Sequence, residues 1–474
     1  MSNRRRTVHN IVLALGAQSI SLCLSVVVAL LLPKVLGVEE FAYWQLYMFY
    51  SSLVGFFHLG LNDGVYLKLG GSLFDSLDSR TISSGFWASI VLALFWALVG
   101  VVYAILSGSD PSRAFVLIAV SVYLLLWNPS MFLNYLLQAT NRVSTYSASI
   151  SLGSLFSLIG IIALMIAHVY TFQAYVIVIC LSSLVTFGYA ARACRRKITA
   201  RPLPLRESFD FAVSSIRVGL NLMIANICNI LILGVGRLVI EGFWGLETFG
   251  RVSLAISIVT VVQLFITQVG MVLFPALRAS GESSQKYAYE LLRSFIDVAL
   301  PCAYLAYLPI VIFLNYWLPN YHDSTIYLGI LLPLLVFLGG VNLVSFSFFK
   351  VLRRERWILY LNVGAAVLSA LACFLSALIL HSIESVLFSL VLVAWLRYIV
   401  GEYLCAKLMQ AHVGIGPYLQ LSLAAVFTSA YIIFTPLYAW IIVLCAWLMY
   451  LIPLRKSVGM LKTAFPSLIQ KSPG

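Results

Sequence analysis

The residues best suited to bind a charged ligand are arginines inside long apolar runs, and Arg397 is the clearest example. It lies 13 residues into the run 384–409 (397 − 384), where a helix places it near the middle of a bilayer. A charge at that depth costs at least about 2.5–3.5 kcal/mol, so it persists where it faces water or a partner. Val393 and Gly401, four residues away, are uncharged, and Glu402 lies about 140° around the helix. We predict that Arg397 contacts an anionic substrate; an interhelical structural pair is the alternative.

Two further arginines, Arg217 and Arg237, lie near opposite ends of the apolar run 211–240. Each could extend its side chain to the nearer membrane surface, which would make it a simple anchor. A guanidinium also binds phosphate oxygens through charge and paired hydrogen bonds. Both arginines are therefore predicted, with Arg397, as substrate-binding residues.

Acidic residues in the later runs are candidates for ion coupling. Arg293 and Asp297 are four residues apart, so a local salt bridge on one helix face is the simplest interpretation of that pair. Pro301 follows four residues later and predicts a loosened helix there. Asp297 and Glu402 are both predicted as ion-coupling residues.

A second group of titratable residues lies early in the chain. His58 precedes Gly60-Leu61-Asn62-Asp63-Gly64, where two glycines around polar residues predict a break or wide turn near the inner leaflet. Asp63 could exchange a proton or a sodium ion there, and His58 could titrate near neutral pH. A helix cap at the cytoplasmic surface is the alternative interpretation of Asp63.

The first apolar run carries a polar stripe. Asn10, Gln18, Ser21 and Ser25 lie within about 80° of arc when plotted at 100° per residue. Such a stripe is unfavourable against lipid, so it faces protein or a cavity. Its amides and hydroxyls suit a sugar ligand and are predicted to bind substrate, with helix packing as an equal alternative.

The elements that must position these residues are membrane helices. Of 474 residues, 62% are hydrophobic and 10% are charged, and the mean hydropathy is +0.99. Soluble chains carry roughly 25% charged residues, so the composition excludes a conventional soluble enzyme, a disordered chain and a disulfide-stapled secreted module.

Runs of about 20 apolar residues predict an all-α polytopic membrane protein with about fourteen transmembrane helices. We place them near residues 11–32, 42–66, 82–107, 114–138, 145–168, 172–192, 211–240, 248–276, 288–317, 326–351, 357–381, 384–409, 418–435 and 437–455. The last two runs are separated only by Thr435-Pro436-Leu437, so they could form two spans or one interrupted span.

Basic residues set the predicted orientation. Arg4, Arg5 and Arg6 precede the first run, and a cluster between the sixth and seventh runs contains Arg192, Arg195, Arg196, Lys197, Arg201 and Arg206. The outer loops would hold only Lys34, Arg113 and Arg251. Because basic residues favour the cytoplasmic side, we predict a multi-pass protein of the cytoplasmic membrane with both termini in the cytoplasm. The net charge of +13 is then a topology signal, and no nucleic-acid partner is expected.

The sequence contains no familiar signature of catalysis. Walker A, GxSxG and HExxH motifs are absent, and the eight cysteines fall in spans or at their inner ends without metal-ligand spacing. We therefore expect a protein that is not an enzyme and has neither a cofactor nor a metal.

The two halves of the chain contain related segments. Gly37-Val38-Glu39-Glu40-Phe41-Ala42 has a counterpart 208 residues later (245 − 37) in Gly245-Leu246-Glu247-Thr248-Phe249-Gly250. Arg142 and Arg353 match at an offset of 211 (353 − 142). Because each half has six spans, the copies would share one orientation, as in a parallel repeat; chance similarity is the alternative. We predict an N-terminal lobe at 1–200 with a cytoplasmic linker at 191–210, a C-terminal lobe at 211–410, and a helix pair with a tail at 411–474.

Three segments resemble bacterial Wzx-type polysaccharide-biosynthesis flippases of the multidrug/oligosaccharidyl-lipid/polysaccharide exporter superfamily. They are LGVEEFAYWQLYMFYSSLVGFFHLGLNDGVYLKLGG from Leu36, LLQATNRVSTYSASIS, and GRLVIEGFWGLETFGRVSLA followed by LFPALR. The resemblance implies two six-helix lobes facing a central cavity, and flipping of an undecaprenyl-pyrophosphate-linked oligosaccharide from the inner to the outer leaflet. Many relatives carry an acidic-basic pair late in the seventh helix, whereas this chain has Gly236-Arg237.

The residues and the resemblance together predict a flippase in which Arg397 and Arg237, with Arg217, draw a pyrophosphate into the cavity. Expected partners are the lipid-linked oligosaccharide and membrane lipids, with a polysaccharide polymerase and glycosyltransferases as further candidates. Export of small amphipathic compounds is the alternative within the superfamily, and a membrane-embedded polymerase is the alternative of another class. The sugar, the coupling ion, the oligomeric state and the host are left open.

Overall fold

The computed structural model describes residues 19–279, 281–412 and 414–470, and every regular element within these ranges is a helix. Ten helices are long and apolar enough to cross a membrane, or up to 13 spans exist if each of three bent helix pairs is one span. The expected all-α polytopic class is confirmed, whereas the number fourteen stays a prediction.

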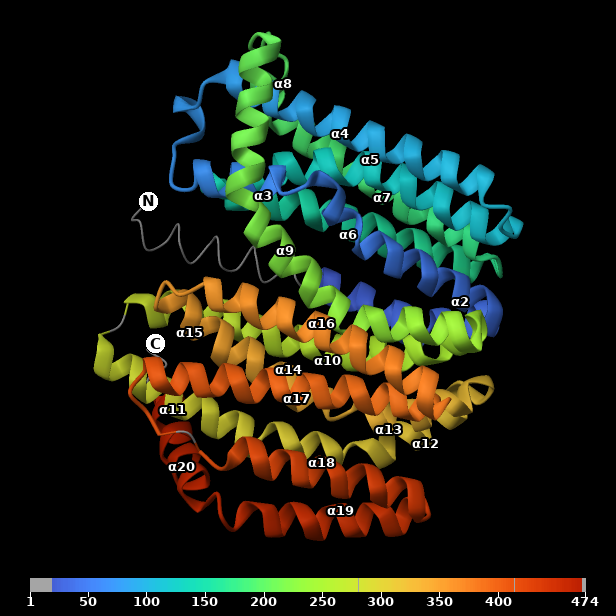
Figure 1. Ribbon diagram of the computed structural model, residues 1–474, viewed down its shortest axis with the longest axis vertical. Helices are drawn as coiled ribbons and strands as arrows, with labels where there is room; N and C mark the ends of the chain where they lie inside the picture. Colours follow the sequence, from blue (N-terminus) through green and yellow to red (C-terminus); the bar gives the residue numbers. More distant parts are fainter. Residues whose placement is uncertain (1–18, 280, 413, 471–474) are drawn as a thin grey trace. The chain divides into compact units, whose positions relative to one another are not determined.

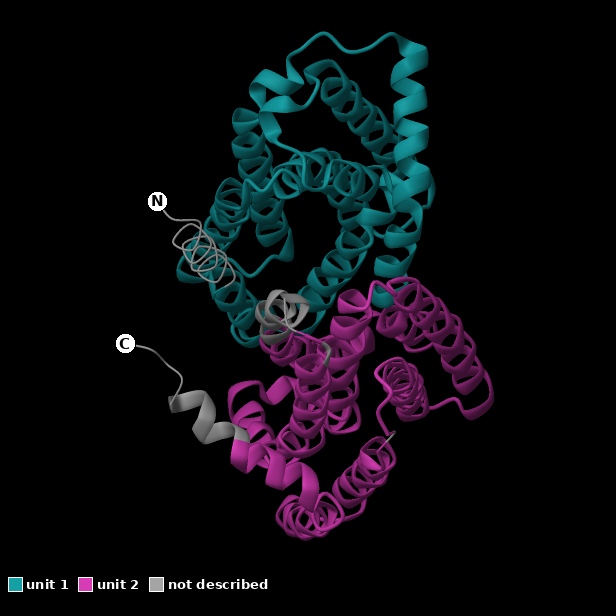
Figure 2. Cartoon of the chain, turned by 90° about the vertical axis from the view of Figure 1, so that its left-hand side faces the viewer, with its two compact units in different colours: residues 1–230 teal, residues 231–474 magenta. Residues whose placement is uncertain are grey.

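The chain divides into two compact units, residues 1–230 and residues 231–474 (Figure 2). The division falls inside the 40-residue helix α9 (Leu205–Trp244), which contributes its first part to unit 1 and its last part to unit 2. The lobe boundaries expected from the sequence stay predictions.

Unit 1 begins with the helix segment Ser19–Leu30, which bends by 69° into the next helix. The following elements are drawn in blue to green in Figure 1: α2 (Leu32–Ser52), η1 (Val54–His58), α3 (Leu61–Leu69), η2 (Phe74–Ser76), α4 (Ser79–Leu106), α5 (Pro111–Ala139), α6 (Val143–Ile166), α7 (Phe172–Ala193), α8 (Arg195–Ile198) and the first part of α9.

Capping residues fix where two of these helices start. The Asp78 carboxylate precedes α4 and accepts hydrogen bonds from the backbone N–H groups of Arg80 and Thr81 and from the Thr81 hydroxyl. The hydrogen bonds from Thr81, followed by those from Arg80, lower the pKa of Asp78. Asp110 caps α5 through the N–H of Arg113, with a proline at the first helical position.

Unit 2 contains the rest of α9 and the helices drawn in yellow-green to red in Figure 1. They are α10 (Leu246–Ala279), α11 (Glu282–Val298), η3 (Leu300–Tyr304), α12 (Tyr307–Trp317), η4 (Pro319–Tyr321), α13 (His322–Leu331), α14 (Leu334–Gly340), η5 (Val341–Ser345), α15 (Phe346–Val351), α16 (Arg356–Leu380), α17 (Ile383–Leu408), α18 (Gly416–Ile433), α19 (Pro436–Leu451) and α20 (Arg455–Gln470).

Two expectations for this half are decided by the structure. Pro301 lies in η3, a 3-10 segment that follows the α-helical part of this span, so the predicted loosening of the helix is confirmed; the span then bends by 41° between Tyr304 and Tyr307. The last two apolar runs form two helices, α18 and α19, separated only by Phe434 and Thr435 and packed against each other.

The repeated segments have the same backbone conformation in both units. Gly37 and Gly245 both take positive φ angles, of 76° and 85°, which glycine adopts without steric cost, and Phe41 and Phe249 are each fully buried four residues later. His168 and His381, 213 residues apart (381 − 168), are both left-handed at the ends of α6 and α16. These shared conformations support the duplication inferred from the sequence.

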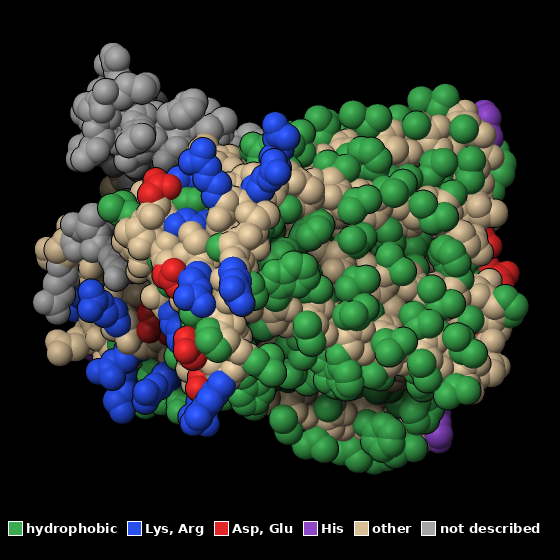
Figure 3. Space-filling view, turned by 90° about the horizontal axis from the view of Figure 1, so that it is seen from above, with side chains coloured by type: hydrophobic (Ala, Val, Ile, Leu, Met, Phe, Trp, Pro, Cys, Tyr) green, Lys and Arg blue, Asp and Glu red, His purple; other side chains and the backbone are tan. Residues whose placement is uncertain are grey.

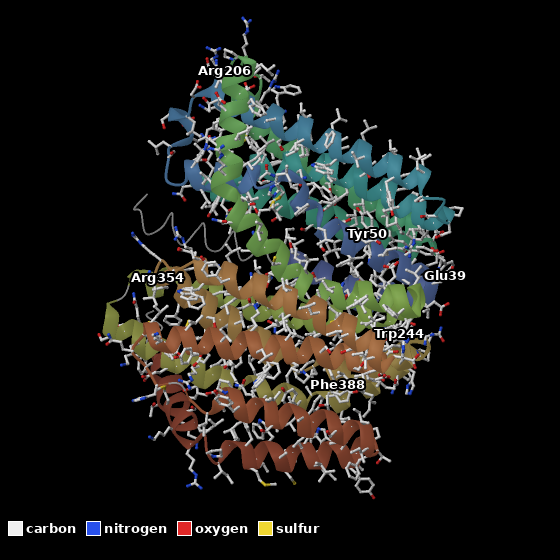
Figure 4. All side chains as sticks on the ribbon, viewed as in Figure 1. Glu39, Tyr50, Arg206, Trp244, Arg354 and Phe388 are labelled. Atoms are coloured by element: carbon white, nitrogen blue, oxygen red, sulfur yellow. The ribbon has the colours of Figure 1, made fainter. Side chains whose placement is uncertain are left out.

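The surface matches the expected membrane environment. The face shown in Figure 3 is covered by hydrophobic side chains, and Lys and Arg gather at one end of it. In unit 2, Arg354 and Trp244 lie at opposite ends of the helices, and in unit 1 so do Arg206 and Glu39 (Figure 4). The two labelled arginines therefore lie at one end of their units, and the location of the termini stays a prediction.

Candidate functional site

Arg397 is buried inside unit 2, where an amide and an aromatic ring contact it. This residue lies on α17 and is 4% exposed. Its Nη2 donates a hydrogen bond of 2.6 Å to Oδ1 of Asn362 on α16. Its guanidinium carbon lies 5.1 Å from the centroid of the Phe346 ring, within the range of a cation–π interaction. We call Arg397, Asn362 and Phe346 the Arg397 site. Sequence spacing predicted the burial of this arginine but not its two partners.

Glycines allow α17 to approach the segment that precedes Phe346. A Cβ at Gly401 would lie 2.6 Å from the Ser345 Oγ, and a Cβ at Gly340 would lie 2.2 Å from the Tyr398 ring. The intervening segment η5 is a π-helix, a distortion that occurs often at functional sites because it re-aims neighbouring side chains. The position of Phe346 beside Arg397 follows from this close packing.

The other two predicted arginines differ in exposure. Arg237 is partly buried on α9 within unit 2, and no hydrogen-bond partner of its Nε exists among the described residues. The neighbouring Gly236 packs against Leu390 of α17, where a Cβ would lie 2.7 Å from a leucine methyl group. Arg217 belongs to unit 1 and is exposed.

The predicted local salt bridge between Arg293 and Asp297 is wrong. Arg293 instead pairs with Glu402 of α17, with 2.9 Å between Nε and Oε1, because α11 and α17 lie close enough for an interhelical pair. The same Oε1 accepts a hydrogen bond of 2.9 Å from the Tyr289 hydroxyl. Asp297 is 3% exposed and accepts a hydrogen bond of 2.8 Å from Nε2 of Gln420 on α18. We call these five residues the Asp297 network.

His58 and Asp63 form a second buried group, in unit 1. The predicted break is present: Leu59 and Gly60 take φ angles of 51° and 89° between η1 and α3. Asp63 is 3% exposed in the first turn of α3, so the alternative of a surface cap is wrong. His58 Nε2 lies 3.6 Å from Asp63 Oδ2, while its Nδ1 accepts a hydrogen bond from the Gly60 N–H. The neutral imidazole therefore carries its proton on Nε2, facing the carboxyl group.

Close contacts between backbones explain why this break is buried. A Cβ at Gly64 would lie 1.8 Å from the carbonyl oxygen of Ser215, and a Cβ at Gly219 would lie 2.0 Å from that of Gly60. Gly64, one of the two glycines that predicted a break, and Gly219 therefore let α3 and α9 lie in contact.

The polar stripe of the first run is only partly described, because Asn10 and Gln18 lie outside the described residues. Ser21 Oγ lies 3.1 Å from Ser154 Oγ of α6, and Ser25 donates to the Ser21 carbonyl at 2.9 Å. These contacts are those of helix packing, the alternative weighed for the stripe; its role in binding sugar stays a prediction.

Comparisons with known proteins agree with this fold. Residues 7–280 match a family model described as "Polysaccharide biosynthesis protein", which is 274 residues (280 − 7 + 1) of 474. No curated protein sequence matches the chain. The lipid II flippase MurJ in an inward closed conformation is similar in structure, with a TM-score of 0.62 and 13% identity over 94% of this chain and 98% of that chain.

An inward-facing multidrug resistance MATE family transporter of the MOP superfamily is also similar, with a TM-score of 0.57 and 15% identity. The match covers 84% of this chain and 98% of that chain. A MATE structure in the straight conformation has a TM-score of 0.57 and 13% identity over 85% of this chain and 95% of that chain. At these identities the similarity establishes the fold.

Proposed function

Since the chain belongs to the polysaccharide biosynthesis protein family, we propose that it is a flippase for an undecaprenyl-pyrophosphate-linked oligosaccharide or polysaccharide precursor. It moves this lipid from the inner to the outer leaflet of the bacterial cytoplasmic membrane by alternating access. The family and the fold together support a membrane transporter of the flippase type. The substrate and the direction are part of the proposal.

The observation that carries the proposal is the Arg397 site. A buried guanidinium beside an amide oxygen and an aromatic ring is a planar, charged donor that suits the oxygens of an anion. A pyrophosphate offers several oxygens to this planar donor, and each charge-assisted hydrogen bond is worth about 1.5–3 kcal/mol. Arg237, with its buried Nε lacking a partner among the described residues, is the second proposed contact.

The remaining predicted residues take supporting roles in this proposal. Arg217 is exposed and would attract the head group at the membrane surface, while Ser21 and Ser25, with Asn10 and Gln18, would contact sugar hydroxyls. Asp63, His58, Asp297 and Glu402 are buried titratable groups through which an ion gradient could act. A polymerase and glycosyltransferases are proposed as partners in the same pathway.

Depletion of the protein in its host tests the function. We expect lipid-linked oligosaccharide to accumulate in the inner leaflet and polymer export to stop, and wild-type protein to restore both. The Arg397→Ala variant should fail to restore export although it reaches the membrane at normal levels. Normal export by that variant would contradict the role of Arg397.

Reconstitution in liposomes separates the other functions. A flippase moves the intact lipid-linked precursor between leaflets, an exporter of small amphipathic compounds moves a drug and leaves the lipid in place, and a polymerase changes the lipid covalently. Finding only drug transport or only covalent change would replace the proposed function by the corresponding alternative.

A further inference from the structure

Asp297 is a buried carboxylate at the point where the C-terminal helix pair, α18 and α19, meets the rest of unit 2. Gln420 of α18 donates to its Oδ1 at 2.8 Å, and the Tyr450 hydroxyl of α19 donates to its backbone carbonyl at 2.5 Å. Gly416, the first residue of α18, lies against the same carboxylate, since a Cβ there would be 2.2 Å from Oδ1. Three residues of the helix pair therefore contact this one aspartate.

The guanidinium of the Asp297 network, that of Arg293, pairs with Glu402 and not with Asp297. Arg293 contacts Glu402 through Nε, and its Nη1 donates to the His412 carbonyl in the connection between α17 and α18. The Asp297 carboxylate accepts its hydrogen bond from a neutral amide. Two carboxylates and one guanidinium leave one negative charge in excess at a place where Asp297 is 3% exposed. An uncompensated charge of this kind costs several kcal/mol, and a protein removes that cost by binding a proton.

Unsatisfied oxygens at the same place indicate where that proton belongs. Glu402 Oε2, Gln420 Oε1 and the Tyr398 hydroxyl are fully buried and have no hydrogen-bond partner among the described residues. Two of these three atoms are pure acceptors, so the network lacks donors. A protonated carboxyl group supplies one donor and removes one negative charge, which corrects both deficits together.

The groups that face Asp297 come from several helices. The charged groups interacting with it are Arg293 and Glu402, and the tyrosines that interact with it are Tyr398 and Tyr450. The side chains that interact in turn with Glu402 are Tyr289 and Cys405, and those that interact with Tyr450 are Cys302 and Tyr304. The basic residues of α20 that are described lie at exposed positions: Arg455, Lys456 and Lys462. On α14 and η5 no titratable side chain is present.

We propose that Asp297 is a proton-binding site, with Glu402 as the neighbouring acceptor, and that the bound proton holds the C-terminal helix pair against α11 and α17. The step is a simple protonation: the carboxylate takes a proton from water-borne hydronium and becomes a neutral acid. Loss of that proton restores the excess negative charge, which weakens the packing of Gly416, Gln420 and Tyr450 around it. This inference goes beyond the proposed function, because it concerns how the helix pair is held and not what is transported.

Hydrogen exchange of the purified full-length protein tests the site. Exchange in peptides from α18 and α19 is measured between about pH 5 and about pH 9, after correction for the intrinsic rate, in buffers with choline as the only salt cation. In the wild type we expect protection of these helices to fall at least about tenfold as the pH rises, which corresponds to 1.4 kcal/mol. The Asp297→Asn variant, which mimics the protonated acid, should stay protected at every pH.

Two further variants keep the test decisive. Asp63→Asn is the matched control, the same change at a buried aspartate of unit 1, and it should leave the pH dependence of α18 and α19 as in the wild type. Glu402→Gln leaves Arg293 to balance the ionised Asp297, so no excess negative charge forms at high pH and the loss of protection should be smaller than in the wild type. This variant serves if Asp297→Asn does not fold.

Three outcomes would overturn the proposal. They are protection of α18 and α19 that does not change with pH in the wild type, a pH dependence that persists in Asp297→Asn, and a loss of protection in Glu402→Gln as large as that in the wild type. A sodium arm separates the two sources of a single positive charge: if the wild type is protected at high pH in sodium but not in choline, the ligand is a metal cation and the proton assignment is wrong.

Discussion

Arg293 and Arg397 lie in the same unit, on helices that pack close together, yet their surroundings differ in charge. Arg293 faces the carboxylate of Glu402 at 2.9 Å and a backbone carbonyl, whereas Arg397 faces the amide of Asn362 and the ring of Phe346. Removing Arg293 would strand the buried Glu402 carboxylate, whereas removing Arg397 would take a contact from an amide and from an aromatic ring. The comparison separates an arginine that stabilises the fold from one suited to a ligand, a distinction that burial alone does not make.

The largest expected effect is on stability, in Arg293→Ala. Glu402 would be left fully buried without its cation, which costs about 3–5 kcal/mol. We expect a marked fall in the thermal unfolding temperature of the purified protein and in its level in the membrane. Arg354→Ala, which removes an exposed arginine of the same unit, is the control and should change neither. Equal stability of Arg293→Ala and wild type would end the assignment of Arg293 as the structural arginine.

The second effect is on transport, in Arg397→Ala. Loss of a charge-assisted hydrogen bond to the substrate should raise the activation free energy of transport by about 2–3 kcal/mol. The transport rate should therefore fall roughly 30- to 150-fold. Stability should fall less than in Arg293→Ala, because loss of Arg293 strands the buried Glu402 carboxylate. Arg397→Lys should recover only part of the rate, since an ammonium lacks the planar pair of donors. The comparison fails if Arg397→Ala unfolds as readily as Arg293→Ala.

The third effect concerns the packing that places Phe346. Gly340→Ala would put a Cβ 2.2 Å from the Tyr398 ring, and overpacking of this kind costs about 1–3 kcal/mol. Gly364→Ala on α16 is the matched control, because a Cβ there meets no atom within 4 Å. Thermal unfolding of the two variants should move in opposite directions, with Gly364→Ala slightly stabilised by its better helix propensity. Similar behaviour of both variants would argue against close packing at Gly340.

The smallest effect is expected for Asn362→Ala, which removes the amide that orients Arg397. Losing this one bond should cost about 1 kcal/mol, seen as a roughly fivefold weaker apparent affinity for the lipid substrate. The maximal rate should fall less, because the guanidinium itself remains. An affinity equal to that of the wild type would show that Phe346 and the helix backbone suffice to orient Arg397.

The sequence predicted features that depend on neighbours along the chain. Apolar runs located the helices, Pro301 located a bend, and the glycines around Asp63 located the break before α3. Each of these signals is local, because hydrophobic span length and backbone freedom are properties of a short segment.

Interactions between distant segments could not be predicted in the same way. Arg293 pairs with Glu402, which lies 109 positions away (402 − 293). The i, i+4 spacing had predicted Asp297 as its partner. Asn362, Phe346 and Gln420 were missed for the same reason, since a neutral residue in an apolar run carries no sign of the charge it will contact.

The continuity of α9 has a mechanical consequence. Forty residues form the single helix α9, and the division between the two units falls within it. A flexible loop would let one unit turn while the other stays still, whereas a hydrogen-bonded helix transmits rotation and pull along its axis. Any rearrangement of one unit must therefore either be carried to the other through α9 or bend that helix.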